Sequence, residues 1–183
     1  MSARAVSAPR AQLPNALTIL RLALVPVFAV LLIRSDDGHS LAAAVVFGVA
    51  GITDQIDGYL ARRWHVESRF GAVADPLADR LMIDVAVLLL CLDGRLPWLG
   101  FVVILGRDVT LLVGATVLQP RGVEVKVSFV GKTATWILYA AIGFRIVTHD
   151  ATSWPLWLFW IGLGGALAAT LLYMRDAVRV LRQ

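Results

Sequence analysis

Four aspartates stand beside long apolar runs in the segment TDQIDGYLARRWHVESRFGAVADPLAD, residues 53–79. Asp54 and Asp57 are three residues apart, and Asp75 and Asp79 are four apart. On helices, both spacings put the two side chains of a pair on one face. A charged side chain in a membrane-spanning helix costs about 2.5–3.5 kcal/mol at the helix centre and less near its ends. The four carboxylates therefore require protonation or bound cations.

The donor atoms of this cluster indicate which cation it would bind. Carboxylate oxygens are hard ligands that favour Mg²⁺, or Mn²⁺, over thiol-seeking metals. His65 lies in the connection between the two aspartate pairs, where a solvated side chain is the simpler interpretation, so a zinc site is not favoured. The single cysteine, Cys91, lies inside an apolar run and is interpreted as a buried packing thiol. If cations rather than protons neutralise the cluster, two divalent ions, Mg²⁺ or Mn²⁺, would balance its four carboxylates.

The elements that position these aspartates are six apolar segments. Of the 183 residues, 58% are hydrophobic and only 16% are charged, which is typical of a polytopic membrane protein. Each segment is close to the roughly 20 residues that cross a bilayer as a helix, and lipid offers no partners to other backbone conformations. We predict an all-α integral membrane protein, a single domain over residues 1–183. The spans are expected at 16–33, 41–60, 72–92, 97–118, 128–147 and 154–174.

The segment before the first span has two interpretations. RAQLPNALTILR, residues 10–21, fits an interfacial N-terminal helix, with Pro14 and Asn15 near a helix entry. The alternative is an irregular tail that runs directly into the span.

The lysines and arginines predict the orientation in the membrane. If the N-terminus is cytoplasmic, eleven fall on the inner side and three on the outer side, a clear positive-inside bias. Both termini and the aspartate-rich segment are then cytoplasmic, and the net charge of +4 suits a membrane surface better than nucleic acid. The inner residues are Arg4, Arg10, Arg62, Arg63, Arg69, Arg121, Lys126, Lys132, Arg175, Arg179 and Arg182, and the outer ones are Arg34, Arg95 and Arg145.

Small and basic residues accompany the aspartates at fixed spacing. The whole pattern is Asp54-x2-Asp57-Gly58-x2-Ala61-Arg62-x8-Gly71-x3-Asp75-x3-Asp79. It resembles the signature of the CDP-alcohol phosphatidyltransferase family at all eight positions. LPNALTILRLALVP, GRDV and SFVGKTAT also resemble the branch that contains phosphatidylglycerophosphate synthases and CDP-alcohol-type cardiolipin synthases. The resemblance covers roughly residues 13–140, and Gln55 is a mild departure outside the signature.

The resemblance implies an activity and roles for these residues. Family members transfer a phosphatidyl group from a CDP-lipid to an alcohol and release CMP. By that analogy two Mg²⁺ ions, with Mn²⁺ as an alternative, bind Asp54, Asp57, Asp75 and Asp79. Asp79 would also be the catalytic base on the acceptor hydroxyl. The CDP or CMP moiety would lie against Asp57, Gly58, Ala61, Arg62 and Gly71.

Three cations in or at the ends of apolar spans are candidates for binding an acceptor phosphate. They are Arg21, Arg107 and Lys132, because an intramembrane charge is a functional hypothesis by default. In the alternative interpretation, Asp84 and Asp108 pair with these cations structurally.

The expected function is therefore phosphatidyl transfer from CDP-diacylglycerol to glycerol 3-phosphate, in phospholipid biosynthesis. The alternative within the class is a cardiolipin synthase, which uses phosphatidylglycerol as acceptor. A remote alternative is a divalent-cation transporter, whose path would be lined by the acidic cluster. The resemblance also implies a homodimer, and the bacterial plasma membrane is the expected location.

Overall fold

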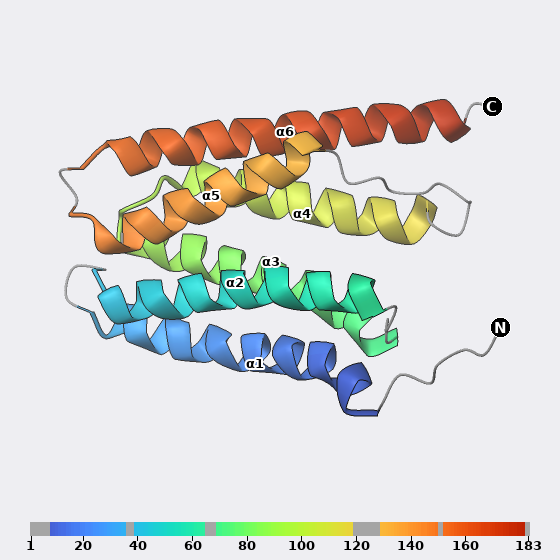
Figure 1. Ribbon diagram of the computed structural model, residues 1–183. Helices are drawn as coiled ribbons and strands as arrows, with labels where there is room; N and C mark the ends of the chain where they lie inside the picture. The colour runs from blue at the N-terminus through green and yellow to red at the C-terminus, as the bar shows by residue number, and fades with distance from the viewer. Residues whose placement is uncertain (1–7, 36–38, 65–68, 119–128, 150–151, 182–183) are drawn as a thin grey trace. The chain divides into compact units, whose positions relative to one another are not determined.

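The computed structural model of the chain describes residues 8–35, 39–64, 69–118, 129–149 and 152–181. For the helical residues 8–15, 54–64, 69–79, 115–118, 176–178 and 180–181 it describes the backbone alone. The described ranges hold six α-helices and no strand (Figure 1). The helices are α1 Ala8–Ile33, α2 Leu41–Trp64, α3 Arg69–Leu92, α4 Trp98–Leu118, α5 Phe129–Val147 and α6 Trp154–Leu181.

The six helices confirm the all-α class, and each coincides with one expected apolar segment. The largest differences lie near the ends of the chain, since α1 begins at Ala8 and α6 runs on to Leu181. Residues 8–15 are helical and continuous with the first span, so they are not an irregular tail, and an interfacial position for this part of α1 stays a prediction. Pro14 is the seventh residue of α1, and because it has no backbone N–H it cannot donate the helical hydrogen bond to the carbonyl of residue 10.

Within the described part of the chain, two helices have the length and composition to cross a membrane. Ala16–Ile33 has 18 residues and Trp154–Arg175 has 22, which correspond to about 27 and 33 Å against a hydrocarbon core of about 30 Å. Leu41–Thr53 is a shorter apolar stretch within α2. This is consistent with a membrane protein, and the remaining spans stay a prediction.

Local signals set several helix ends. Ser40 caps α2, because its Oγ accepts a hydrogen bond of 3.1 Å from the Ala43 amide. After α3 the chain turns at Gly94, whose φ of 71° lies in the left-handed region that favours glycine. At α6, the Ser153 carbonyl accepts from the Leu156 amide at 3.1 Å. These turns keep the connections before α2, α4 and α6 short.

The chain divides into two compact units, Met1–Leu89 and Leu90–Gln183. In the first unit, α1 and α2 run antiparallel and pack against each other (Figure 1). The rings of Phe28 and Phe47 pack with their centroids 5.6 Å apart, and both side chains are buried. Leu32, Ala43 and Ala50 are also fully buried, so large side chains of α1 pack beside small ones of α2.

In the second unit, α5 and α6 make the closest helix contact. A Cβ added at Gly162 of α6 would lie 2.9 Å from the backbone nitrogen of Leu138 on α5. One turn further along α6, a Cβ at Gly165 would lie 3.1 Å from the Ala134 Cβ. The glycines therefore allow the two antiparallel backbones to approach closely.

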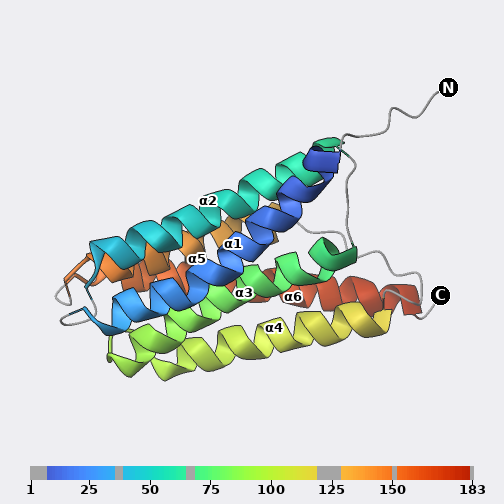
Figure 2. The same cartoon turned by 90° about the horizontal axis from the view of Figure 1, so that it is seen from below.

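Helix α4 packs against α6 in the parallel direction (Figures 1 and 2). A Cβ at Gly100 would lie 2.6 Å from the Phe159 ring, and a Cβ at Gly114 would lie 3.4 Å from the Tyr173 ring and hydroxyl. Both pairs are 59 residues apart in the chain, so the two helices keep one register over four turns. An aromatic side chain of α6 fills the space over a glycine of α4 at each end.

Two buried arginines join the short turns of the second unit. The Arg95 guanidinium donates to the carbonyls of Arg145 and Thr148, in the last turn of α5 and just beyond it. Arg145 in turn donates from Nε to the Arg95 carbonyl at 2.9 Å and from Nη1 to the Thr152 carbonyl at 3.2 Å. The two side chains are 3% and 8% exposed. The guanidinium groups thus satisfy one carbonyl of the last turn of α5 and three carbonyls of the neighbouring turns.

Candidate active site

The residues of the expected signature lie on two helices of the first unit. Positions 54, 57, 58, 61 and 62 fall in the last three turns of α2, and positions 71, 75 and 79 fall in the first three turns of α3. Figures 1 and 2 show these two helix ends at the same end of the first unit, together with the start of α1. The connection of four residues limits the separation of the two helix ends to at most about 18 Å.

The structure confirms the helical setting that the aspartate spacing requires. Residues 54 and 57 lie about 60° apart around α2, and residues 75 and 79 lie about 40° apart around α3. Each pair thus shares one face of its helix. The side chains of Asp54, Asp57, Asp75 and Asp79, and those of Ala61 and Arg62, lie outside the described part of the structure. Among the side chains that are described, no cluster of three His, Cys, Asp or Glu is found.

Arg21 is the most deeply buried cation among the described residues of the first unit. Its side chain is 0% exposed, and Thr18, one turn before it, is 1% exposed. Arg21 lies seven residues before Phe28, and position 54 lies seven residues after Phe47. Because α1 and α2 are antiparallel, both positions lie about 10.5 Å from the packed phenylalanine pair in the same direction. Thus α1 brings Arg21 to the level of the first aspartate pair on α2.

In the second unit, Arg107 forms an ion pair with the next residue of α4. Its Nη1 donates to Asp108 Oδ1 at 3.2 Å, and the two side chains are 15% and 9% exposed. The structural pairing considered for Asp108 is therefore present. Arg107 lies on the stripe of α4 that also carries Gly100 and Gly114, seven residues away on either side. This stripe packs against α6 at both glycines.

Along the axis of α6, Lys132 lies at the level of Arg107. However, Lys132 does not lie on the face of α5 that packs against α6. The offset of 59 residues puts Arg107 beside Ala166, and the contact of Ala134 with Gly165 puts Lys132 beside position 167. The two levels differ by about 1.5 Å along α6. However, Lys132 is exposed and lies about 160° around α5 from Ala134, which faces α6.

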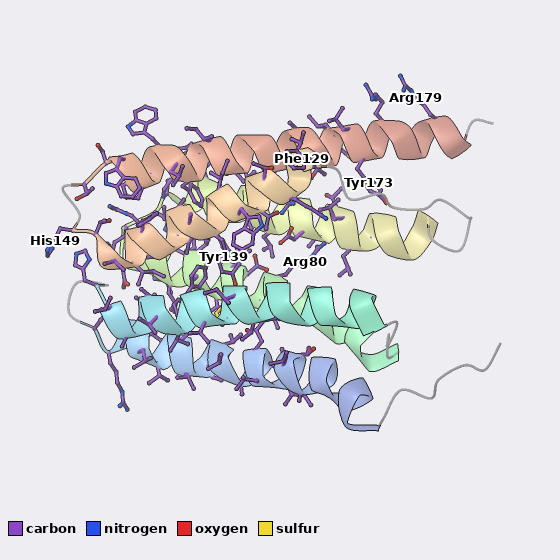
Figure 3. All side chains as sticks on the ribbon, viewed as in Figure 1. Arg80, Phe129, Tyr139, His149, Tyr173 and Arg179 are labelled. Atoms are coloured by element: carbon purple, nitrogen blue, oxygen red, sulfur yellow. The ribbon has the colours of Figure 1, made fainter. Side chains whose placement is uncertain are left out.

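Tyr173 was not among the residues that the sequence singled out. Its side chain points from α6 toward α4, and its hydroxyl is enclosed next to Gly114 (Figure 3). The heptad spacing of Gly100, Arg107 and Gly114 matches that of Phe159, Ala166 and Tyr173. This repeat of small and large residues is the sequence signal that could have predicted the contact. A polar group thus lies two turns from Arg107 along the same helix face.

The comparison with known families defines the class of this protein. Residues 11–171 match the CDP-alcohol phosphatidyltransferase family. The match covers most of α1, all of α2 to α5 and most of α6. The chain belongs to the CDP-alcohol phosphatidyltransferase family.

Individual relatives narrow the comparison within the family. A probable phosphatidylglycerophosphate synthase of Mycobacterium tuberculosis is 40% identical over 140 residues, which are 75% of this chain and 66% of the relative, just under two thirds of its length. Two relatives are named CDP-diacylglycerol–glycerol-3-phosphate 3-phosphatidyltransferase. The Pseudomonas fluorescens protein is 42% identical over 158 residues, 84% of this chain and 79% of its own length. The Bacillus subtilis protein is 30% identical over 166 residues, 80% of this chain and 86% of its own length.

Proposed function

We propose that this chain transfers a phosphatidyl group from CDP-diacylglycerol to glycerol 3-phosphate and releases CMP. The observation that carries the proposal is the eight-residue signature, which lies at the adjoining ends of α2 and α3 inside the region that matches the family. The names of the relatives support glycerol 3-phosphate as acceptor over phosphatidylglycerol. A divalent-cation transporter has no support from the family.

The aspartate cluster suits a pair of divalent cations. Four carboxylates on two helices supply hard oxygen donors, which fit Mg²⁺ and also Mn²⁺. We assign Asp54, Asp57, Asp75 and Asp79 as the metal ligands. When bound, such ions polarise the attacked phosphate and stabilise the charge that develops on the leaving CMP.

The protein's own groups have simple tasks in this reaction. The acceptor hydroxyl oxygen bonds to the phosphatidyl phosphorus, and the bond from that phosphorus to the CMP oxygen breaks. The proton of the hydroxyl passes to the Asp79 carboxylate, which acts as general base. Gly58, Ala61 and Gly71 leave room for the nucleotide because their side chains are minimal, and Arg62 pairs with a phosphate.

The acceptor phosphate requires cations near the reacting groups. Arg21 supports this role because it lies at the level of position 54 and is fully buried in α1. Arg107 is mostly buried on α4 and Lys132 is exposed on α5, and both stay candidates for this role on the sequence pattern. Arginine presents a planar fork that suits phosphate oxygens, whereas lysine acts as a point charge.

The membrane setting completes the proposal. The donor carries acyl chains that belong in the bilayer and a nucleotide that belongs in water, so a site at the cytoplasmic interface reaches both. We propose six spans with cytoplasmic termini in a bacterial plasma membrane, and a homodimer. The two apolar helices and the bacterial relatives support this setting.

An acceptor panel tests the proposal. Purified protein in detergent receives CDP-diacylglycerol, Mg²⁺ and one acceptor, which is glycerol 3-phosphate, phosphatidylglycerol or inositol phosphate, and CMP release is measured. Release with glycerol 3-phosphate, its loss with EDTA and its recovery with added Mg²⁺ are the expected results. Release with phosphatidylglycerol alone would make the protein a cardiolipin synthase. If no acceptor gives CMP release and CMP does not stabilise the protein against heat, the proposed phosphatidyltransferase activity is refuted.

A further inference from the structure

The ion pair on α4 has an unusual local geometry. Neighbouring residues of a helix project about 100° apart and do not face each other. Nevertheless, Arg107 Nη1 lies 3.2 Å from Asp108 Oδ1. The Arg107 side chain must therefore turn sideways around the helix instead of extending along it. The ion pair therefore restricts the orientation of the Arg107 guanidinium.

The backbone that carries this pair is itself held in place. Gly100 and Gly114 contact α6 closely, and Arg107 lies midway between them on the same stripe. Ala166, the residue of α6 at this level, is 0% exposed. A guanidinium on a tightly packed helix, oriented by a mostly buried carboxylate, meets the requirements for a preorganised anion-binding group.

We propose that Asp108 is a positioning residue, which orients Arg107 for the phosphate of the acceptor. The inference rests on the proposed function, because the acceptor phosphate is what Arg107 is assigned to bind. An arginine without such a partner distributes over many rotamers, and phosphate binding must then fix them. Asp108 fixes the side chain before the acceptor arrives.

A purely structural role makes different predictions. If Asp108 only offsets the charge of Arg107 inside an apolar helix, its loss adds one unit of positive charge near the acceptor. The KM for an anionic acceptor would then fall or stay the same. Positioning predicts a rise in that KM despite the more favourable charge. The two roles therefore differ in the sign of one measured change.

The experiment compares three variants of the full chain in detergent with the unsubstituted protein. Asp108→Asn removes the charge, and Asp108→Glu keeps it but moves the carboxylate by one methylene. Asp93→Asn removes the same charge at an exposed position in the turn before α4, as a matched control. The KM for glycerol 3-phosphate and the KM for CDP-diacylglycerol are measured from CMP release.

Positioning predicts a graded effect on the acceptor alone. The KM for glycerol 3-phosphate rises by about tenfold in Asp108→Asn, equivalent to about 1.4 kcal/mol, and by a smaller factor in Asp108→Glu. The KM for CDP-diacylglycerol stays within about twofold, as does every constant of Asp93→Asn, since neither contact to Arg107 nor buried charge changes there.

Each other outcome overturns the inference. An unchanged or lower acceptor KM in Asp108→Asn refutes positioning, and if that variant does not fold, an unchanged acceptor KM in Asp108→Glu refutes it equally. Activity of the unsubstituted protein with glycerol 3-phosphate leaves the proposed function standing in either case. Lack of that activity overturns both proposals together.

Discussion

The close approach of α5 and α6 at Gly162 predicts that adding one methyl group there, in Gly162→Ala, changes the stability of the protein. A Cβ at this position would lie 2.9 Å from the Leu138 backbone nitrogen, 3.1 Å from the Leu138 Cα and 3.2 Å from the Ile137 Cγ2. Two of these atoms belong to the backbone of α5 and cannot rotate away. In Gly162→Ala the two helices must therefore move apart by a few tenths of an ångström.

The expected magnitude follows from two opposing terms. Overpacking a close contact costs about 1–3 kcal/mol. Alanine in place of glycine within a helix returns about 1 kcal/mol. Gly162→Ala should therefore lower the free energy of unfolding by about 0–2 kcal/mol. Gly164→Ala is the matched control, because nothing lies within 4 Å of its added Cβ. That variant receives only the gain of about 1 kcal/mol.

The two variants are compared by thermal unfolding in one detergent, followed by tryptophan fluorescence. A difference of about 1–3 kcal/mol corresponds to a Tm for Gly162→Ala that is about 2–12 °C below that of Gly164→Ala, at about 2–4 °C per kcal/mol for a chain of this size. Equal Tm values, or a higher Tm for Gly162→Ala, would refute the close packing of α5 on α6.

Three further substitutions test other parts of the chain. Asp75→Asn should lower Mg²⁺-dependent CMP release by about 100-fold or more, because it removes an assigned metal ligand, and full activity in the folded variant would end the two-metal proposal. Arg145→Met should lower the Tm, at a cost of about 1–3 kcal/mol for each buried carbonyl left without a donor, whereas the exposed Arg34→Met should not. Phe47→Ala should cost about 3–5 kcal/mol through the cavity it leaves beside α1, and the half-exposed Val49→Ala should cost far less; similar losses in the two variants would contradict the packing.

The six helices could be predicted from the sequence because each is a long apolar run between turn residues. Their ends were less predictable. Polar residues 8–15 continue α1, and α6 extends past Arg175 to Leu181, since a helix continues wherever its backbone bonds can form, whatever the polarity of its side chains. The apolar runs therefore predicted where the helices lie but not where each helix stops.

Some features of the candidate site could also be predicted from the sequence, and others could not. The aspartate spacing is a local property of two helices, and the sequence placed it on helical segments that the structure confirms. The pairing of Arg107 with Asp108 joins neighbouring residues and was one of the two interpretations that the sequence allowed, whereas the enclosure of Tyr173 depends on packing between segments about 60 residues apart. No local pattern determines such contacts, although the matching heptads of α4 and α6 suggest them after the fact. The reciprocal bonds of Arg95 and Arg145 were not predicted either, because both had been interpreted only as charges on the outer side.

The helix registers link the packing contacts to the positions of the charged residues. In the first unit, the phenylalanine contact sets the level of Arg21 relative to position 54. In the second unit, glycine contacts set the levels of Arg107 and Lys132 along α6. In both cases an apolar contact with no chemical role decides where a charge lies along the helix axis. A change of register by one residue at either contact should therefore alter substrate binding as well as stability, because it moves a cation by about 1.5 Å and turns it by about 100°. Such a displacement exceeds the tolerance of roughly 0.5 Å within which a functional group must be held.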